Sequence, residues 1–263
     1  MSNIHPTAII EQGAIINESA IVEAHCFVSS KAVLESGVHL MQGAQVRNRT
    51  TLGENVKIFP YAMIGSIPQD LKYNEQEDTA LEIGANTVIR EFATINTGTK
   101  GGGGITKIGQ NVFIMNYCHV AHDCILGDNI ILANNATLAG HVEVGSNTVI
   151  GGLTPVHQFV KIGEGCMIAG GSALSQDIPP FCLAEGNRAV VKSLNIVGLR
   201  RSKSKEQIDK LKKAYNLLFR SNQPLKETAQ SIYEQSDDED VKKMCEFILN
   251  TKRGIPYQRG KHE

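Results

Sequence analysis

The stretch LGDNIILANNATLAGHVEVGSNTVI, residues 126–150, repeats one chemical pattern every six residues. An aliphatic residue opens each repeat: Leu126, Leu132, Leu138, Val144 and Ile150. A period of six fits neither an α-helix, with 3.6 residues per turn, nor a plain strand, with a period of two. It is typical of a short strand followed by a corner, with three such units in each turn of a triangular prism.

The same register extends in both directions from this stretch. Every sixth position is aliphatic over residues 4–64, 83–95 and 108–174. The fifth position of the repeat is usually small, and the fourth often carries Asn or Gly, which tolerate a left-handed corner. Eighteen residues make one coil, so residues i and i+18 share a column and lie about 4.8 Å apart. The pattern resembles the hexapeptide-repeat left-handed parallel β-helix, and the left hand is taken from that resemblance.

Two polar stretches interrupt the register, at residues 70–82 and 98–107, and both predict insertions at a corner of the prism. The second contains a glycine run at 101–104. No Gly-Lys-Ser/Thr sequence and no helix follow that run, so it predicts a mobile loop rather than a phosphate-binding loop.

Beyond residue 190 the apolar period becomes helical, and shorter helices are expected at 224–235 and 238–250. The sequence therefore predicts a mainly β domain over 1–189 and an α-helical domain over 190–263. Residues 188–220 carry ten Lys or Arg and two Asp or Glu, a local charge of +8. That charge suits either an acidic partner or a solvated helix face.

Bulk composition limits the class of protein. The 263 residues carry a net charge of −1 and 41% hydrophobic residues, which suits a globular protein with an ample core. The sequence shows no run of eighteen apolar residues, no signal-peptide pattern and no CxxC pair. We therefore expect a cytoplasmic protein with reduced thiols, no integral membrane segment and no nucleic-acid partner.

Histidines gather in and after HVAHD, residues 119–123. The register places the polar residues of this region in three neighbouring columns: His122 with Gly140 and Gln158, Asp123 with His141, and His157 beside them. His119 ends the preceding repeat and lies around a corner. The arrangement predicts a compact patch on one edge of the prism.

One interpretation of this patch is acyl transfer assisted by a general base. A neutral His122 imidazole can take a proton from an attacking hydroxyl group, and Asp123 can orient the imidazole if the corner bends the right way. The Gly140 N–H can stabilise an oxyanion, and the missing side chain leaves room for a substrate. The cysteines occupy the small fifth position and predict core packing, so we expect direct transfer without a covalent intermediate.

Two other interpretations remain open at this level. His122, His141 and His157 could bind Zn²⁺, as in a γ-carbonic-anhydrase-like hydratase on the same scaffold. The histidines could also be ordinary surface residues of a non-enzymatic trimeric scaffold.

Several segments are similar to the UDP-N-acetylglucosamine acyltransferase family: HVAHDC at 119–124, ILANNATLAGH at 131–141, IGGLTPVHQF at 150–159, IPQDLKY at 67–73, and the EGNRA and NIVGLRR sequences after residue 184. The resemblance covers nearly the whole chain. It implies transfer of an (R)-3-hydroxyacyl group from acyl carrier protein to the glucosamine 3-position of UDP-N-acetylglucosamine, or of its 3-amino analogue, in the first step of lipid A biosynthesis. It also implies a homotrimer with active sites between subunits. The donor is a phosphopantetheine thioester, and we expect no other cofactor and no metal.

The resemblance also implies roles for individual residues. His122 matches the catalytic base, Asp123 its partner, Gly140 the oxyanion donor and Gly170 an acyl-chain ruler that leaves room for a long chain. The remaining matches are placed with the substrate: Asp70, Lys72, His119, His141, His157, Gln158, Asn195 and Arg201. Val197 and Ser202 depart from the family, which often has an acid and a second Arg there. The +8 segment then suits acyl carrier protein, which is acidic.

Overall fold

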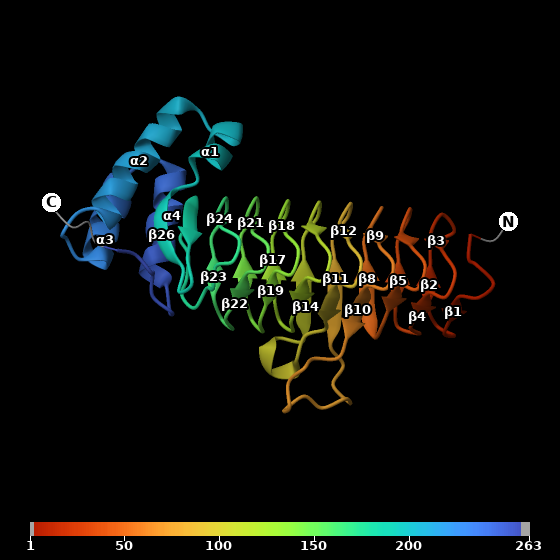
Figure 1. The fold of residues 1–263 in the computed structure, drawn as a ribbon. Coiled ribbons are helices and arrows are strands. Elements are labelled where there is room, and N and C mark those ends of the chain that lie inside the picture. Colours follow the sequence, from red (N-terminus) through yellow and green to blue (C-terminus); the bar gives the residue numbers. More distant parts are fainter. Residues whose placement is uncertain (1–2, 259–263) are drawn as a thin grey trace.

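The computed structural model describes residues 3–258 and shows a three-sided β-helix with α-helices packed at its C-terminal end (Figure 1). Residues 1 and 263, the outer limits of the two predicted domains, lie outside the described residues. Three sheets form the sides of the prism, and from β1 to β24 the strands are parallel and successive strands along the chain belong to successive sheets.

The strands are assigned to the three sides as follows. Sheet I contains β1 (Ile9–Ile10), β4 (Phe27–Val28), β7 (Gln45–Val46), β10 (Met63–Ser66), β13 (Thr94–Asn96), β16 (His119–Val120), β19 (Thr137–Leu138) and β22 (Pro155–Val156). Sheet II contains β2 (Ile15–Ile16), β5 (Val33–Leu34), β8 (Arg49–Leu52), β11 (Ala80–Ile83), β14 (Ile105–Ile108), β17 (Ile125–Leu126), β20 (Glu143–Val144) and β23 (Lys161–Ile162). Sheet III contains β3 (Ile21–Val22), β6 (His39–Leu40), β9 (Lys57–Ile58), β12 (Val88–Ile89), β15 (Phe113–Ile114), β18 (Ile131–Leu132), β21 (Val149–Ile150), β24 (Met167–Ile168), β25 (Cys182–Glu185) and β26 (Val190–Leu194).

The six-residue register holds throughout the prism. The first-position aliphatic side chains from Val22 to Leu174 point inward and are at most 3% exposed. Strand partners such as Ile125 and Glu143 are eighteen residues apart, as the coil length predicts. The fourth position has a left-handed backbone at its asparagines, with φ between 56° and 63° from Asn111 to Asn147. The predicted inward row and the predicted corner residues are therefore confirmed.

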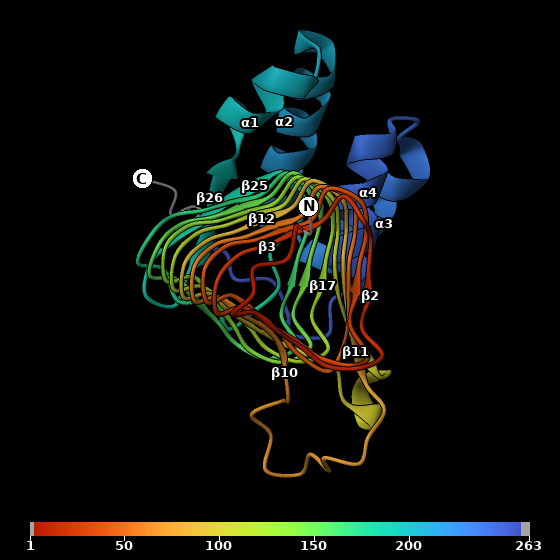
Figure 2. The same cartoon turned by 90° about the vertical axis from the view of Figure 1, so that its right-hand side faces the viewer.

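Both insertions leave the edge between sheets I and II, on the side opposite α1 and α2 (Figure 2). The first joins β10 to β11, and the second joins β13 to β14. Each ends three residues earlier than predicted, because residues 80–82 and 105–107 belong to strands. Those strands run to four residues because the paired side chains of Leu81 and Thr106 are fully buried and extend the core toward this edge.

The C-terminal end begins with a strand rather than a helix. Residues 190–194 form β26, which pairs antiparallel with β25 and ends the coil, so the helical region starts at Ile196. Four helices follow: α1 (Ile196–Ser202), α2 (Lys205–Phe219), α3 (Leu225–Gln235) and α4 (Glu239–Asn250). The predicted helices at 224–235 and 238–250 match α3 and α4 to within one residue. In residues 3–258 every helix is too short or too polar to span a membrane.

Candidate active site

The corner between β16 and β17 places His122 beside Asp123. Asp123 adopts a left-handed backbone conformation with φ 60°, which Asp tolerates better than most residues. This corner brings His122 Nδ1 to 2.7 Å from Asp123 Oδ2. An ionised carboxylate only accepts hydrogen bonds, so Nδ1 carries the proton and Nε2 is left as the basic nitrogen. The side-chain contact that strand geometry alone left open is therefore present.

The second insertion covers the Asp123 carboxylate, whose side chain has no solvent exposure. Thr99 donates its backbone N–H to Oδ1 and its hydroxyl to Oδ2, both at 2.8 Å. The Asp123 N–H donates to the Thr106 hydroxyl oxygen. The glycine run predicted as a mobile loop thus begins with a short 3₁₀ helix, η1 (Lys100–Gly102), which is tied to Asp123 through Thr99.

Gly140 lies one coil away, directly against the His122 ring. A Cβ added to Gly140 would lie 2.6 Å from Cε1 and 2.8 Å from Nε2 of His122. We expected the missing side chain of Gly140 to leave room for a substrate, whereas the space is occupied by the His122 imidazole itself. No described residue accepts a hydrogen bond from the Gly140 N–H. The geometry is compatible with the predicted oxyanion role, and His122 sets the limit on side-chain size.

His141 and His119 flank this pair on the same coils. The His141 ring lies edge-on to His122, with 5.2 Å between ring centroids, and stacks on Phe159. His141 Nε2 is 3.7 Å from Asp123 Oδ2. His119 Nδ1 lies 2.7 Å from the Thr94 hydroxyl, and burial, with a smaller contribution from the charge of His122, lowers the pKa of His119. The lowered pKa favours the neutral form of His119.

The three-histidine metal set is not assembled in the described part of the chain. His157 is exposed, and its Nδ1 lies near the backbone carbonyl oxygen of Gln158, which is also exposed. The group whose ligand atoms lie within 4.8 Å of one another is instead His122, Asp123 and His141. In that group the Asp123 carboxylate already accepts from Thr99 and His122.

Two predicted residues lie on the first insertion, which leaves the edge between sheets I and II, as does the β16–β17 corner that carries His122. The Asp70 carboxylate accepts the backbone N–H of Lys72 and forms a local turn, and the Lys72 side chain is exposed. The insertion is joined to the second one, because the Lys100 N–H donates to the Glu77 carboxylate at 2.7 Å. The first insertion, which carries Asp70 and Lys72, is thus hydrogen-bonded to the second insertion, which in turn binds Asp123 through Thr99.

Three other predicted residues are not brought to His122 within one chain. Asn195 is the N-cap of α1, where its Oδ1 accepts from Gly198 and its Nδ2 donates to the Gly165 carbonyl. Arg201 is exposed on the same helix, which lies across the prism from the insertions (Figure 2). Gly170 is exposed at the edge between sheets III and I, and a Cβ there would meet only Gly152, at 3.2 Å from its carbonyl oxygen.

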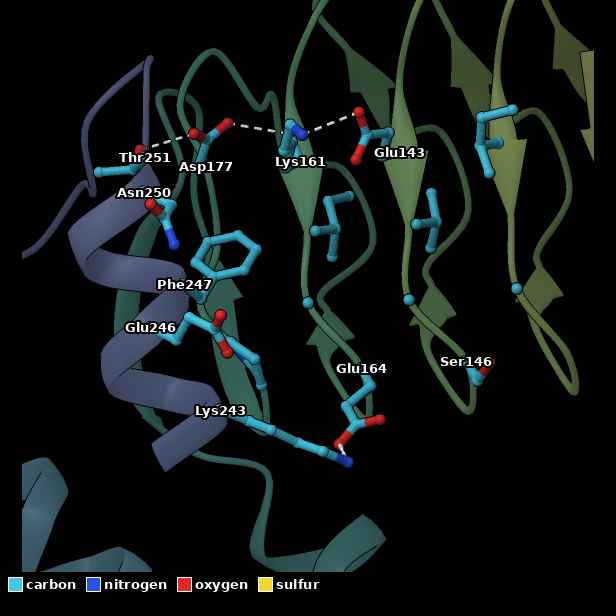
Figure 3. A pocket seen from close by; sticks show the side chains of 17 residues that line it. Glu143, Ser146, Lys161, Glu164, Asp177, Lys243, Glu246, Phe247, Asn250 and Thr251 are labelled. Carbon is cyan, nitrogen blue, oxygen red and sulfur yellow. Dashed lines mark hydrogen bonds and ion pairs between the residues drawn. The ribbon is translucent and has the colours of Figure 1, made fainter. Parts of the chain in front are cut away.

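A groove of about 520 Å³ lies between α4 and sheet II and does not include His122 (Figure 3). Two ion pairs lie in it: Lys161 pairs with Glu143, and Lys243 pairs with Glu164, both at 2.9 Å. Asp177 accepts the Lys161 N–H and the Thr251 hydroxyl. These contacts join the β-helix to the C-terminal helices, and they present no activated nucleophile or base.

Sequence reasoning missed Thr99 and Thr106. Both lie in or beside an insertion, where the six-residue register is interrupted, so no column could be assigned to them. The glycine run gave no signal for them, because the collision of a Cβ on Gly102 with the Asp123 carboxylate is known only from the structure.

Comparisons with known proteins agree with this geometry. Residues 105–140 match the bacterial transferase hexapeptide model, and residues 177–256 match the model for domain 2 of UDP N-acetylglucosamine O-acyltransferase. The acyl-[acyl-carrier-protein]–UDP-N-acetylglucosamine O-acyltransferase of Campylobacter concisus is 58% identical over 99% of this chain and 100% of that protein.

Solved structures give the same result. The UDP-N-acetylglucosamine acyltransferase of Campylobacter jejuni superposes with a TM-score of 0.94 at 58% identity, covering 97% of this chain and 100% of that one. The Francisella novicida enzyme superposes with a TM-score of 0.94 at 32% identity, covering 97% of this chain and 94% of that one.

A left-handed β-helix of hexapeptide repeats with an imidazole–carboxylate pair on one edge defines a hexapeptide-repeat transferase. Within that class, the chain belongs to the UDP-N-acetylglucosamine O-acyltransferase family and is an acyltransferase. These comparisons give no support to the zinc hydratase or to the non-enzymatic scaffold.

Proposed function

We propose that this enzyme transfers an (R)-3-hydroxyacyl group from acyl carrier protein to the glucosamine 3-position of UDP-N-acetylglucosamine, in the first step of lipid A biosynthesis. Full-length relatives at 58% identity carry names that state the donor protein and the acceptor. The observation that carries the chemistry is the 2.7 Å contact between His122 Nδ1 and Asp123 Oδ2, which leaves Nε2 as the base.

The proposed reaction is a direct acyl transfer. His122 Nε2 takes the proton of the sugar 3-hydroxyl, whose oxygen attacks the thioester carbonyl carbon. The Gly140 N–H stabilises the negative oxygen of the tetrahedral intermediate, and Asp123 stabilises the imidazolium. The C–S bond then breaks, and the thiolate of phosphopantetheine takes the proton from His122. Proton and acyl group are both accounted for without a further cofactor or a metal.

A covalent cysteine intermediate is disfavoured by burial. All six cysteines are buried and free. Burial raises the pKa of Cys124, the thiol nearest in sequence to His122, to about 12, and that of Cys118 to about 11. A thiol is nucleophilic as the thiolate, so these groups are unreactive near neutral pH.

The acceptor site is proposed to combine two subunits. Six residues on or near the edge between sheets I and II, where the insertions lie, are assigned to the UDP-sugar: Asp70, Lys72, His119, His141, His157 and Gln158. Asn195 and Arg201 are assigned from a neighbouring subunit, because α1 lies across the prism from the insertions (Figure 2). Gly170 of the neighbouring subunit, at the edge between its sheets III and I, would contact the acyl chain and limit its length.

A homotrimer in the cytoplasm is the proposed assembly. Tyr61, Phe92 and Tyr117 form an exposed aromatic stack on the edge between sheets III and I, with centroids 5.6 and 5.2 Å apart. The insertions, which lie on another edge, do not cover this stack. An exposed apolar patch of this kind is typical of a subunit contact. The basic segment 188–220 is proposed to attract acyl carrier protein.

The function is tested by offering the purified enzyme a mixture of 3-hydroxyacyl carrier proteins of different chain length with UDP-N-acetylglucosamine and with its 3-amino analogue. We expect mass spectrometry to detect a 3-O-acyl product from a long-chain donor. Exclusive acylation of the 3-amino sugar would change the proposed acceptor, and no acylation of either sugar would refute the proposal.

A further inference from the structure

The residue that fixes the Asp123 carboxylate comes from the second insertion. Thr99 provides two of the hydrogen bonds that the carboxylate accepts, one through its N–H and one through its hydroxyl. The third comes from His122 Nδ1. Because these donors together reach both oxygens of the carboxylate, the plane of Asp123 is fixed, and that plane sets the orientation of the imidazole.

The direction of the Thr99 hydroxyl is itself determined by η1. Thr99 is the N-cap of this short helix, and its Oγ1 accepts the Gly102 N–H at 3.0 Å. A hydroxyl has one hydrogen, so the oxygen that accepts from Gly102 is left to donate to Asp123 Oδ2. Gly102 passes so close to the carboxylate that a Cβ on it would collide with Asp123. The insertion is therefore fitted to the carboxylate by both a hydrogen bond and a steric limit.

We infer that Thr99 is a positioning residue for the acyl transfer, an inference that rests on the proposed function. By holding Asp123, Thr99 keeps the proton on His122 Nδ1 and keeps Nε2 free to act as the base. A charge-assisted hydrogen bond in a buried site is among the stronger hydrogen bonds in proteins. Through Thr99 alone, the second insertion is thus linked to the carboxylate that orients the base.

Kinetics of three variants test this role. Thr99→Val keeps the shape but removes the hydroxyl, Thr99→Ser keeps the hydroxyl, and Thr97→Val is the matched control. The Thr97 hydroxyl oxygen accepts from Thr79 at 3.1 Å and holds the insertions together without contacting Asp123. We expect Thr99→Val to lower kcat roughly 10- to 100-fold with KM for the UDP-sugar changed less than about threefold. Thr99→Ser should stay within about threefold of wild type.

Nitrogen-15 NMR of histidine-labelled enzyme provides a readout that general destabilisation does not imitate. Wild type and Thr97→Val should show His122 as the Nδ1–H tautomer, whereas Thr99→Val should populate the Nε2–H tautomer as well. Gly102→Ala, which pushes on the carboxylate directly, should cause the same change, and it replaces Thr99→Val if that variant does not fold.

The outcomes separate this inference from the proposed function. Wild-type acyl transfer with an unchanged kcat and an unchanged His122 tautomer in Thr99→Val and Gly102→Ala would overturn the positioning role and leave the function standing. A wild-type enzyme without acyl transfer would refute the function, and the tautomer measurement would then still decide whether Thr99 holds the pair.

Discussion

Gly140 lies so close to His122 that a methyl group on its Cα would be 2.6 Å from the imidazole Cε1. The two residues come from successive coils and occupy the same position of the repeat, eighteen residues apart. The His141 N–H donates to the His122 carbonyl oxygen at 3.0 Å, which fixes the spacing of the two coils at this corner. The base and the proposed oxyanion donor are therefore held by the same backbone hydrogen bonds.

Gly140→Ala should damage turnover more than stability. The methyl group cannot fit beside the ring, so the imidazole must rotate away from the substrate side. A displacement of about 1 Å costs roughly 10²-fold in rate. Measurement of kcat together with the thermal midpoint of unfolding checks this, and a variant with normal turnover would remove the steric argument.

His122→Ala should lower kcat by about 10²- to 10⁴-fold while the fold stays intact, because the ring is a partly exposed corner group and not part of the core. Steady-state kinetics and circular dichroism are the measurements. His39→Gln, at an outward position of the N-terminal coils where His39 pairs with Glu23, is the matched control and should keep full activity. Activity of His122→Ala within about tenfold of wild type contradicts the general-base role.

Because several thiols are buried, we expect the folded enzyme to lose stability at alkaline pH. Burial raises the pKa of Cys166 to about 12 and that of Cys118 to about 11, compared with an ordinary value near 9. These thiols ionise in the unfolded chain first, so their contribution to stability is complete below pH 9 and is lost as the pH rises toward 12. Denaturant unfolding at pH 7, 9 and 10.5 should show this fall, and Cys166→Ala should flatten it. Rapid labelling of the native enzyme by iodoacetamide at pH 8 would show that the thiols are accessible and would contradict this prediction.

Phe92→Asp should weaken the proposed trimer. Phe92 is the middle ring of the stack with Tyr61 and Tyr117, and a charge buried there in a subunit contact has no partner. Analytical ultracentrifugation should show a shift to smaller species and a parallel loss of activity. Tyr233→Asp, a similar change at an exposed position of α3, should leave the assembly unchanged. An unaltered trimer for Phe92→Asp would place the subunit contact elsewhere.

Salt should slow the reaction with the protein donor. If the basic segment 188–220 attracts acyl carrier protein, raising NaCl from low to high concentration screens that attraction and lowers kcat/KM roughly tenfold. An acyl-pantetheine donor lacks the acidic protein and is the control, with a much smaller expected decrease. Equal salt dependence for both donors would remove the electrostatic role of the segment.

The sequence predicts the prism well because the six-residue pattern is a property of every coil. Each inward position must hold an aliphatic side chain of similar size, so Leu132 and Ile150 each indicate the repeat as clearly as any other first-position residue. The insertions break this redundancy, and there the predicted limits were wrong by three residues at their C-terminal ends. The β26 strand was also missed, since it pairs antiparallel and follows no repeat.

The register also predicts which residues of the site share an edge, but not how their side chains meet. It places Gly140 one coil after His122 in the same column, whereas the contact of His122 with Asp123 depends on the left-handed backbone at Asp123. It says nothing about Thr99, whose position follows from the fold of an irregular segment. Asn195 shows a further limit: the chain uses its amide to cap α1, and its distance from His122 only becomes apparent in three dimensions.

The division of the prism into equal coils has a consequence for how such a chain can change in length. The proposed catalytic group spans two adjacent coils, so no coil can be added between His122 and Gly140 without separating them. The coils before Leu52 carry none of the proposed site residues, and each is bounded by the same hydrogen-bonded register. Duplication or loss of eighteen residues there would lengthen or shorten the prism by one coil without moving the proposed site residues relative to one another.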